Sequence, residues 1–185
     1  MPILAQDLEL VARSKGGDPS AYDELVRKYQ DRLYNALVHF LGDAPAAEDL
    51  AQEAFLKAYV RIQDFRGDSQ FYTWLYAIAR NLSVSRQRQV ARRGRVGSLD
   101  SEDAPQVMSS QGDPIGNAMS RDREMLVQEA LQALDAESRW IVVLRDIDGR
   151  DYAEIAEAAG IPVGTVKSRL HRARMQLRQL LEGRV

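Results

Sequence analysis

The chain has 185 residues, 45% of them hydrophobic, with 25 basic and 27 acidic side chains, which allows two small folded domains and argues against a large enclosed active-site cavity. The absence of cysteine excludes disulfides and thiolate metal sites, while two histidines, His39 and His171, leave little for metal or imidazole chemistry. We therefore expect no cofactor, no metal site and no catalytic residue. No stretch approaches the ~20 apolar residues that cross a bilayer, so we expect a cytoplasmic protein without direct membrane insertion.

Charge is segregated along the chain, although the net charge is only −2. Residues 74–99 contain six arginines and no acid, and residues 163–181 contain five bases and no acid. Residues 43–53 are acidic, and residues 100–113 hold four acids without a base. This distribution predicts two basic surfaces that meet polyanions and a third surface that meets a different partner.

The first half of the chain predicts three helices. The first begins at Asp18-Pro19, where a capping acid precedes proline at the first helical position, and it ends before Gly42. A second helix follows Pro45 and is broken at residues 66–68, and a third starts near Phe71 and frays into the arginine-rich segment. Apolar residues recur at helical spacing almost throughout, and no long run of period two predicts a sheet.

Residues 94–120 lack periodic apolar residues and consist largely of Gly, Ser, Asp, Pro and Gln, which is the composition of a flexible connector. Beyond it, helices are predicted at 125–134, 138–147, 152–159 and 163–181. We therefore predict an all-α protein with two small helical domains, residues 1–93 and 121–185, joined by a flexible acidic linker at 94–120. In the free chain these modules would change their separation readily.

The last two predicted helices have the pattern of a helix-turn-helix. Asp151 and Glu154 form a capping-box pattern, and Gly160 can adopt the left-handed conformation of a sharp turn. The final helix has an apolar stripe that commits one side to the core, made of Val163, Val166, Leu170, Ala173 and Leu177. Its other face is polar and basic. Such a helix can enter a DNA major groove, although a basic face can also serve only to keep a surface helix soluble.

The N-terminal module has two further features, a polar stripe on its second helix and an aromatic and basic segment at 65–81. In the second helix a polar stripe lies opposite the apolar one; it consists of Asp49, Gln52, Glu53, Leu56 and Lys57. The stripe is either merely solvated or binds a partner. Residues 65–81 combine aromatic side chains with a basic, acid-free continuation, and aromatics can stack on unpaired bases while arginines follow the backbone. The alternative is that the aromatics form core, as we expect for Phe71 and Trp74.

Three runs together resemble a known family: AEDLAQEAFLKAY at 47–59, FRGDSQFYTWLYAIARN at 65–81 and IPVGTVKSRLHRAR at 161–174. They closely resemble extracytoplasmic-function (ECF) sigma factors of the sigma-70 family, of the RpoE-like kind, in sequence, order and spacing. The resemblance covers about residues 18–89 and 124–181, which look like sigma regions 2 and 4. It implies a factor that binds core RNA polymerase, recognises the promoter minus-thirty-five and minus-ten elements, promotes DNA melting, and is controlled by an anti-sigma factor.

The resemblance also implies site residues. The clamp helices of the largest polymerase subunit would bind Asp49, Gln52, Glu53 and Phe55. The minus-ten element would bind at Phe71, Tyr76, Arg80, Asn81, Arg86 and Arg88. The minus-thirty-five element would bind Thr165, Lys167, Ser168, Arg169, His171 and Arg172. Further implied partners are the flap of the second-largest subunit and an anti-sigma factor that can hold the protein at the membrane, while the acidic linker would thread through basic polymerase channels.

The sequence also has features of two other classes of protein, a helix-turn-helix regulator and a nuclease. An ordinary helix-turn-helix regulator would use the C-terminal module alone and would leave the Asp49 stripe and the aromatics of residues 65–81 unexplained. A nuclease would need clustered carboxylates with an activating partner. The acids of residues 43–53 lie on one surface helix without such a partner, so we expect no enzymatic activity.

Overall fold

The helices of the first half begin and end at residues whose chemistry favours those positions. In helix α2 (Pro19–Leu41), the Asp18 carboxylate accepts a hydrogen bond from the Ser20 backbone N–H, and Gly42 ends the helix in the left-handed conformation with φ of 75°. Helix α3 (Ala44–Val60) is capped in the same way by Asp43, and Pro45 lies in its first turn. The predicted limits of the first helix are confirmed.

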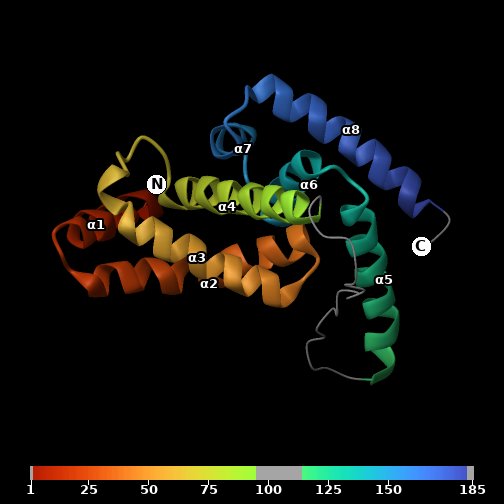
Figure 1. Ribbon diagram of the computed structural model, residues 1–185, viewed down its shortest axis with the longest axis horizontal. Helices are drawn as coiled ribbons and strands as arrows, with labels where there is room; N and C mark the ends of the chain where they lie inside the picture. The colour runs from red at the N-terminus through yellow and green to blue at the C-terminus, as the bar shows by residue number, and fades with distance from the viewer. Residues whose placement is uncertain (1, 95–113, 183–185) are drawn as a thin grey trace.

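The computed structural model describes residues 2–94 and 114–182, and side chains within 5–86 and 122–182. All regular elements in these ranges are helical (Figure 1). The other elements are α1 (Pro2–Lys15), the short η1 (Ile62–Asp64), α4 (Phe71–Gly94), α5 (Pro114–Gln132), α6 (Ala136–Val142), η2 (Val143–Ile147), α7 (Tyr152–Ala159) and α8 (Val163–Leu181). The prediction of an all-α fold is confirmed.

Helix α1 was not predicted from the sequence. Its buried face mixes apolar Leu10 and Val11 with polar Asp7 and Ser14, and this mixture hides the helical period. The Asp7 carboxylate accepts hydrogen bonds from Tyr29 Oη and from Lys28 Nζ, the latter at 2.5 Å. These contacts hold α1 against α2.

The C-terminal module differs from its predicted outline in two places. The helix predicted at 138–147 is divided into α6 and the π-helical turn η2, which begins at Val143. Helix α5 begins at Pro114, inside the range assigned to the linker. Residues 95–113, which contain the rest of the predicted linker and all four of its acids, lie outside the described residues.

The two modules pack against each other through α2 and α4. The Phe40 ring of α2 meets Trp140 of α6 edge-on at a centroid distance of 4.9 Å, and Tyr76 of α4 meets the same indole at 5.6 Å. Buried residues of both modules therefore belong to one continuous hydrophobic core. Figure 1 shows α7 and α8 on the α4 side of the N-terminal bundle. The sequence predicted the modules but not this contact.

Candidate polymerase and nucleic-acid interfaces

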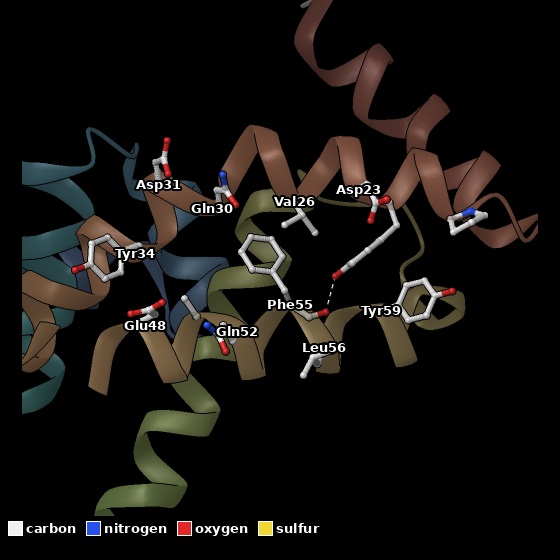
Figure 2. A pocket seen from close by; sticks show the side chains of 13 residues that line it. Asp23, Val26, Gln30, Asp31, Tyr34, Glu48, Gln52, Phe55, Leu56 and Tyr59 are labelled. Atoms are coloured by element: carbon white, nitrogen blue, oxygen red, sulfur yellow. Dashed lines mark hydrogen bonds between the residues drawn. The ribbon is translucent and has the colours of Figure 1, made fainter. Parts of the chain in front are cut away.

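A groove of about 820 Å³ lies between α2 and α3. Figure 2 shows the Phe55 ring and Val26 inside it. Tyr22, which also lines the groove, donates a hydrogen bond to the Phe55 carbonyl at 2.5 Å. Leu56 stands at the groove with 69% of its surface exposed. Acidic side chains from both helices line the groove as well: Asp23, Asp31 and Glu48. An apolar floor with acidic neighbours suits a helix that carries apolar and basic side chains.

The predicted polymerase-binding residues lie in and beside this groove. Gln52 lines it, and Asp49 is exposed on the same helix. Phe55 is only 7% exposed, as its position in the apolar period requires, yet it forms part of the groove floor. Glu53 is half-buried and pairs with Arg86 of α4 at 2.5 Å. Asp49, Gln52 and Glu53 thus lie on the polar stripe of α3 and Phe55 lies at the groove floor beside it, although Glu53 already has an intramolecular partner.

Sequence reasoning missed the contribution of α2 to the groove. Asp23, Val26, Gln30 and Tyr34 recur at i, i+3, i+7 and i+11, so they lie on one face of the helix and all line the groove. That spacing is visible in the sequence. Only the packing of α2 beside α3 shows that this face of α2 lines a groove rather than facing open solvent.

The predicted minus-ten residues on α4 are mostly covered. Phe71 and Tyr76 are each 1% exposed. Tyr72 and Tyr76 share a hydrogen bond of 2.5 Å between their hydroxyl oxygens. Burial raises the pKa of both phenols well above its usual range, and the negative charge of Asp148 raises it further. Both tyrosines are therefore neutral, and neither is open to a base in this arrangement.

The polar residues of α4 have different surroundings. Arg80 has 20% of its side chain exposed and lies 3.7 Å from Glu137 of α6. Asn81 is exposed, and Arg86 makes the pair with Glu53 described above. Arg88 lies on α4 where side chains are outside the described range. Of the six predicted residues, Asn81 alone is fully exposed among those whose side chains the structure describes.

Helices α7 and α8 form the predicted helix-turn-helix. The capping box of Asp151 and Glu154 is present, and Gly160 is left-handed with φ of 66°, so both predictions are confirmed. The inner stripe of α8 buries Val166, Leu170 and Ala173. Leu177 is only partly buried against the core. Val163 is 39% exposed, because it is the first residue of the helix and lies beyond the packed face; its predicted burial was wrong.

The outer face of α8 carries the predicted minus-thirty-five residues. Exposed on it are Lys167, Ser168, His171 and Arg172. Thr165 is half-buried, and so is Arg169, which pairs with Glu137. The Lys167 ammonium lies 5.7 Å from the centroid of the Tyr152 ring. These residues therefore form a continuous polar and basic face on α8, and this face is accessible from solvent.

Among the described residues, no group of three or more His, Cys, Asp or Glu side chains could hold a metal ion. No helix within the described ranges has the length and apolar character that a membrane span requires.

Comparison with known proteins identifies the family. The family model "Sigma-70 region 2" matches residues 25–93, and "Sigma-70, region 4" matches residues 124–177. The RNA polymerase sigma-H factor of Pseudomonas aeruginosa is 40% identical over 96% of this chain and 94% of its own length. The chain belongs to the sigma-70 family. Within it, this sigma factor is 36% identical to the ECF sigma factor SigW of Bacillus subtilis, over 92% of this chain and 94% of SigW. It is 37% identical to the ECF sigma-E factor of Escherichia coli K12, over 91% and 90% of the two chains.

Solved structures agree with this assignment to the ECF group. CnrH, solved in complex with the cytosolic domain of CnrY, matches with a TM-score of 0.71 and 26% identity, over 96% of this sigma factor and 97% of CnrH. The sigma factor RpoE, solved with the anti-sigma factor NepR from Bartonella quintana, matches with a TM-score of 0.72 and 25% identity, over 88% and 97% of the chains. The protein is thus an ECF sigma factor, a transcription initiation factor built from sigma regions 2 and 4.

Proposed function

We propose that this sigma factor docks on the clamp helices of the largest polymerase subunit through the groove between α2 and α3. The observation that carries the proposal is the groove itself, which combines apolar Phe55 and Leu56 with acids from two helices. Asp49, Gln52 and Glu53 extend the same face of α3. A basic, apolar helix would bury its apolar side chains there and place its cations near the acids.

The second part of the proposal assigns the minus-ten element to α4. Phe71 and Tyr76 supply aromatic rings, while Arg80, Asn81, Arg86 and Arg88 supply polar and basic groups. A base must leave the stack before its edges can be read, and aromatic rings with nearby arginines stabilise an unstacked strand. Tyr76 is buried against Trp140 of α6, so its role requires the C-terminal module to move away from α4. Phe71 is buried within the N-terminal module against Tyr29, Phe65 and Trp74, so movement of the C-terminal module does not by itself expose it.

The third part assigns the minus-thirty-five element to the outer face of α8. Lys167 and Arg172 have the donors that suit guanine edges and phosphates, and Ser168 and His171 lie between them on the exposed face. Thr165 and Arg169 lie at the margin of that face. The region 4 domain would also contact the flap of the second-largest subunit. The polymerase carries out RNA synthesis, so no catalytic step is assigned to the sigma factor.

A further proposed partner is an anti-sigma factor. The solved RpoE of Bartonella quintana is bound to one, NepR, and this chain shares the fold of that sigma factor over both domains. An anti-sigma factor anchored in a membrane would hold this protein at the cytoplasmic face until a signal released it.

Run-off transcription with core polymerase on a library of randomised promoters tests the function and selects the recognised sequence together. Selection of paired minus-thirty-five and minus-ten motifs is the expected result. Core binding is measured in parallel for Asp49→Arg, which should weaken it, and for Glu9→Arg, an equal charge reversal at an exposed position of α1. If Asp49→Arg binds core as tightly as Glu9→Arg, the docking groove is misplaced. If the unaltered chain does not bind core at all, it acts as an ordinary DNA-binding regulator.

A further inference from the structure

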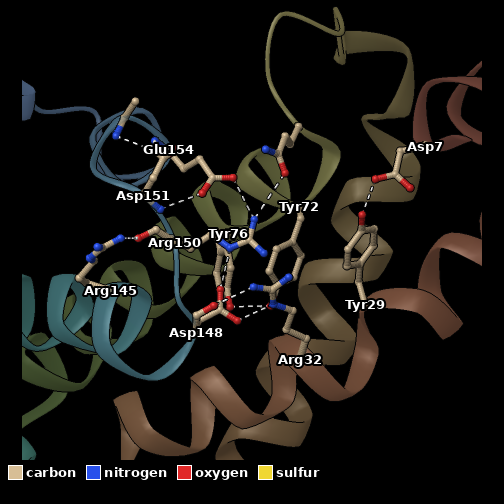
Figure 3. Close-up of polar contacts among 12 residues, drawn as sticks. Asp7, Tyr29, Arg32, Tyr72, Tyr76, Arg145, Asp148, Arg150, Asp151 and Glu154 are labelled. Atoms are coloured by element: carbon tan, nitrogen blue, oxygen red, sulfur yellow. Dashed lines mark hydrogen bonds and ion pairs between the residues drawn. The ribbon is translucent and has the colours of Figure 1, made fainter. Parts of the chain in front are cut away.

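A turn of the C-terminal module, between η2 and α7, lies against α2 and α4. Figure 3 shows Asp148 and Arg150 of this turn beside Arg32 of α2 and beside Tyr72 and Tyr76 of α4. Arg32 Nε donates to Asp148 Oδ1 at 2.6 Å, and a second Arg32 nitrogen donates to the Asp148 carbonyl at 2.7 Å. The two domains are thus joined by a bidentate contact that involves both side chain and backbone.

The charges in this contact are withdrawn from solvent. The Asp148 side chain is 5% exposed and the Arg150 side chain 9%. Arg150 donates to Asp148 at 2.9 Å and to Glu154 at 3.0 Å. The Arg150 and Arg32 guanidinium carbons also lie 4.7 Å and 4.8 Å from the centroid of the Tyr72 ring. Arg32, Tyr72, Asp148 and Arg150 form a set that we name the closure latch.

The contact between Arg32 and Asp148 exists only when the domains are together, whereas Arg150 keeps Asp148 and Glu154, which lie in its own domain. Arg32 is 41% exposed and lies on the surface of α2, so region 2 can fold without its cross-domain bonds. Separation of the domains removes Arg32 from Asp148 and the Arg150 guanidinium from the Tyr72 ring, whereas Arg32 and Tyr72 both belong to region 2. A buried charge that loses its partner is costly until water replaces that partner, so the closed arrangement is a discrete state rather than a loose encounter.

Closure covers one DNA surface and spares the other. Trp140 packs on Tyr76, and Glu137 pairs with Arg80, so these two proposed minus-ten side chains of α4 face the C-terminal domain, while Asn81 is exposed. On α8, Lys167 and Arg172 remain exposed. A closed chain can therefore present its helix-turn-helix to duplex DNA while its minus-ten surface is withdrawn.

From these contacts we infer that the free sigma factor inhibits itself: the closure latch holds region 4 on the minus-ten surface of region 2 without an anti-sigma factor. Core polymerase opens the latch by binding the two domains at separate places. The inference rests on the proposed assignment of Tyr76 and Arg80 to the minus-ten element. It predicts that the free chain binds a minus-thirty-five duplex but not a minus-ten single strand. Loss of the latch should restore binding of the single strand and leave binding of the duplex unchanged.

Closure is measured by energy transfer in the full chain. The chain contains no cysteine, so Val60→Cys on α3 and Gln179→Cys on α8, both exposed, are the only labelling sites. Arg32→Ala should raise the open-to-closed ratio by about tenfold, since it removes one partner of a carboxylate that is only 5% exposed. Arg27→Ala removes the same side chain from an exposed position of the same helix and should leave the ratio unchanged.

Asp148→Ala provides a second variant, because it removes the same contact from the other domain. It should also open the chain, and the double variant Arg32→Ala/Asp148→Ala should open it less than the two single effects combined predict. If neither single variant changes energy transfer relative to Arg27→Ala, the latch does not hold the domains and the inference is wrong.

Inhibition is measured with two probes taken from the promoter selected by run-off transcription. Arg32→Ala should bind the minus-ten non-template single strand about tenfold more tightly than the unaltered free chain, in proportion to the opened fraction, and the minus-thirty-five duplex equally well. An open variant with unchanged single-strand affinity refutes inhibition, and an equal gain on both probes refutes its selectivity. If the proposed minus-ten site is wrong, holoenzyme carrying Arg80→Ala will transcribe normally. In that case the inference of inhibition is wrong as well, while energy transfer still tests whether the latch holds the two domains together.

Discussion

Removal of the Asp7 carboxylate should destabilise the region 2 domain, although Asp7 precedes the segment that the region 2 family model matches. Asp7 is 3% exposed, and it accepts hydrogen bonds from Tyr29 and Lys28. In Asp7→Ala the buried Tyr29 hydroxyl loses its acceptor, and α1 loses its polar attachment to α2.

The size of the effect follows from the two lost contacts. A buried hydroxyl left without a partner costs about 1–3 kcal/mol. The ion pair with Lys28, whose side chain is 27% exposed, is screened by solvent and adds about 1 kcal/mol at most. We therefore expect a loss of roughly 1–4 kcal/mol in the free energy of unfolding. In a chain of this size that loss lowers the melting temperature by roughly 2–15 °C.

Urea titration followed by circular dichroism measures the free energy of unfolding, and scanning calorimetry measures the melting temperature. Glu9→Ala is the matched control, since it removes one negative charge from an exposed position of the same helix. It should change the free energy of unfolding by less than about 0.5 kcal/mol. If Asp7→Ala and Glu9→Ala behave alike, the buried carboxylate does not attach α1 to α2, and the argument from burial is refuted.

Three further predictions concern helix ends and DNA recognition. Hydrogen bonds from Ser20 and Arg13 lower the pKa of Asp18 from its usual 3.8 to about 2, so the stability that its ionised form provides is present above pH 4 and is lost as pH falls toward 2; the stability difference from Asp18→Ala, measured by urea titration, should shrink over that range. Gly42→Ala and Gly17→Ala both place a side chain at positive φ, at about 1 kcal/mol each. Only the new Cβ at Gly42 would meet Gln132, at 2.9 Å, so Gly42→Ala should lose more stability, and equal losses would contradict that contact. Arg172→Ala should weaken binding by about 1–3 kcal/mol in a sequence-dependent manner, measured by titration of promoter variants, and uniform weakening would reassign Arg172 to a phosphate.

The sequence alone predicted features whose causes lie within a few neighbouring residues. Asp18 with Pro19 predicted the start of α2, and Asp151 with Glu154 predicted the capping box of α7. The apolar period of 3.6 residues predicted the buried face of α8, except at Val163, where the helix has only begun. The three family-like runs predicted the sigma family, and the family models and relatives confirm it.

Tertiary structure decided what depends on residues far apart in the chain. The groove exists only because α2 lies beside α3, and the face of α2 that lines it looks like any solvated helix face in the sequence. The burial of Asp7 depends on its contact with Tyr29 of another helix. Arg32 and Asp148 are 116 residues apart. Helix caps and periodicity are local signals, because their hydrogen bonds and packing faces repeat within a turn or two. No local signal records which surface charge will meet another after two domains pack, so the closure latch could be found only in the folded chain.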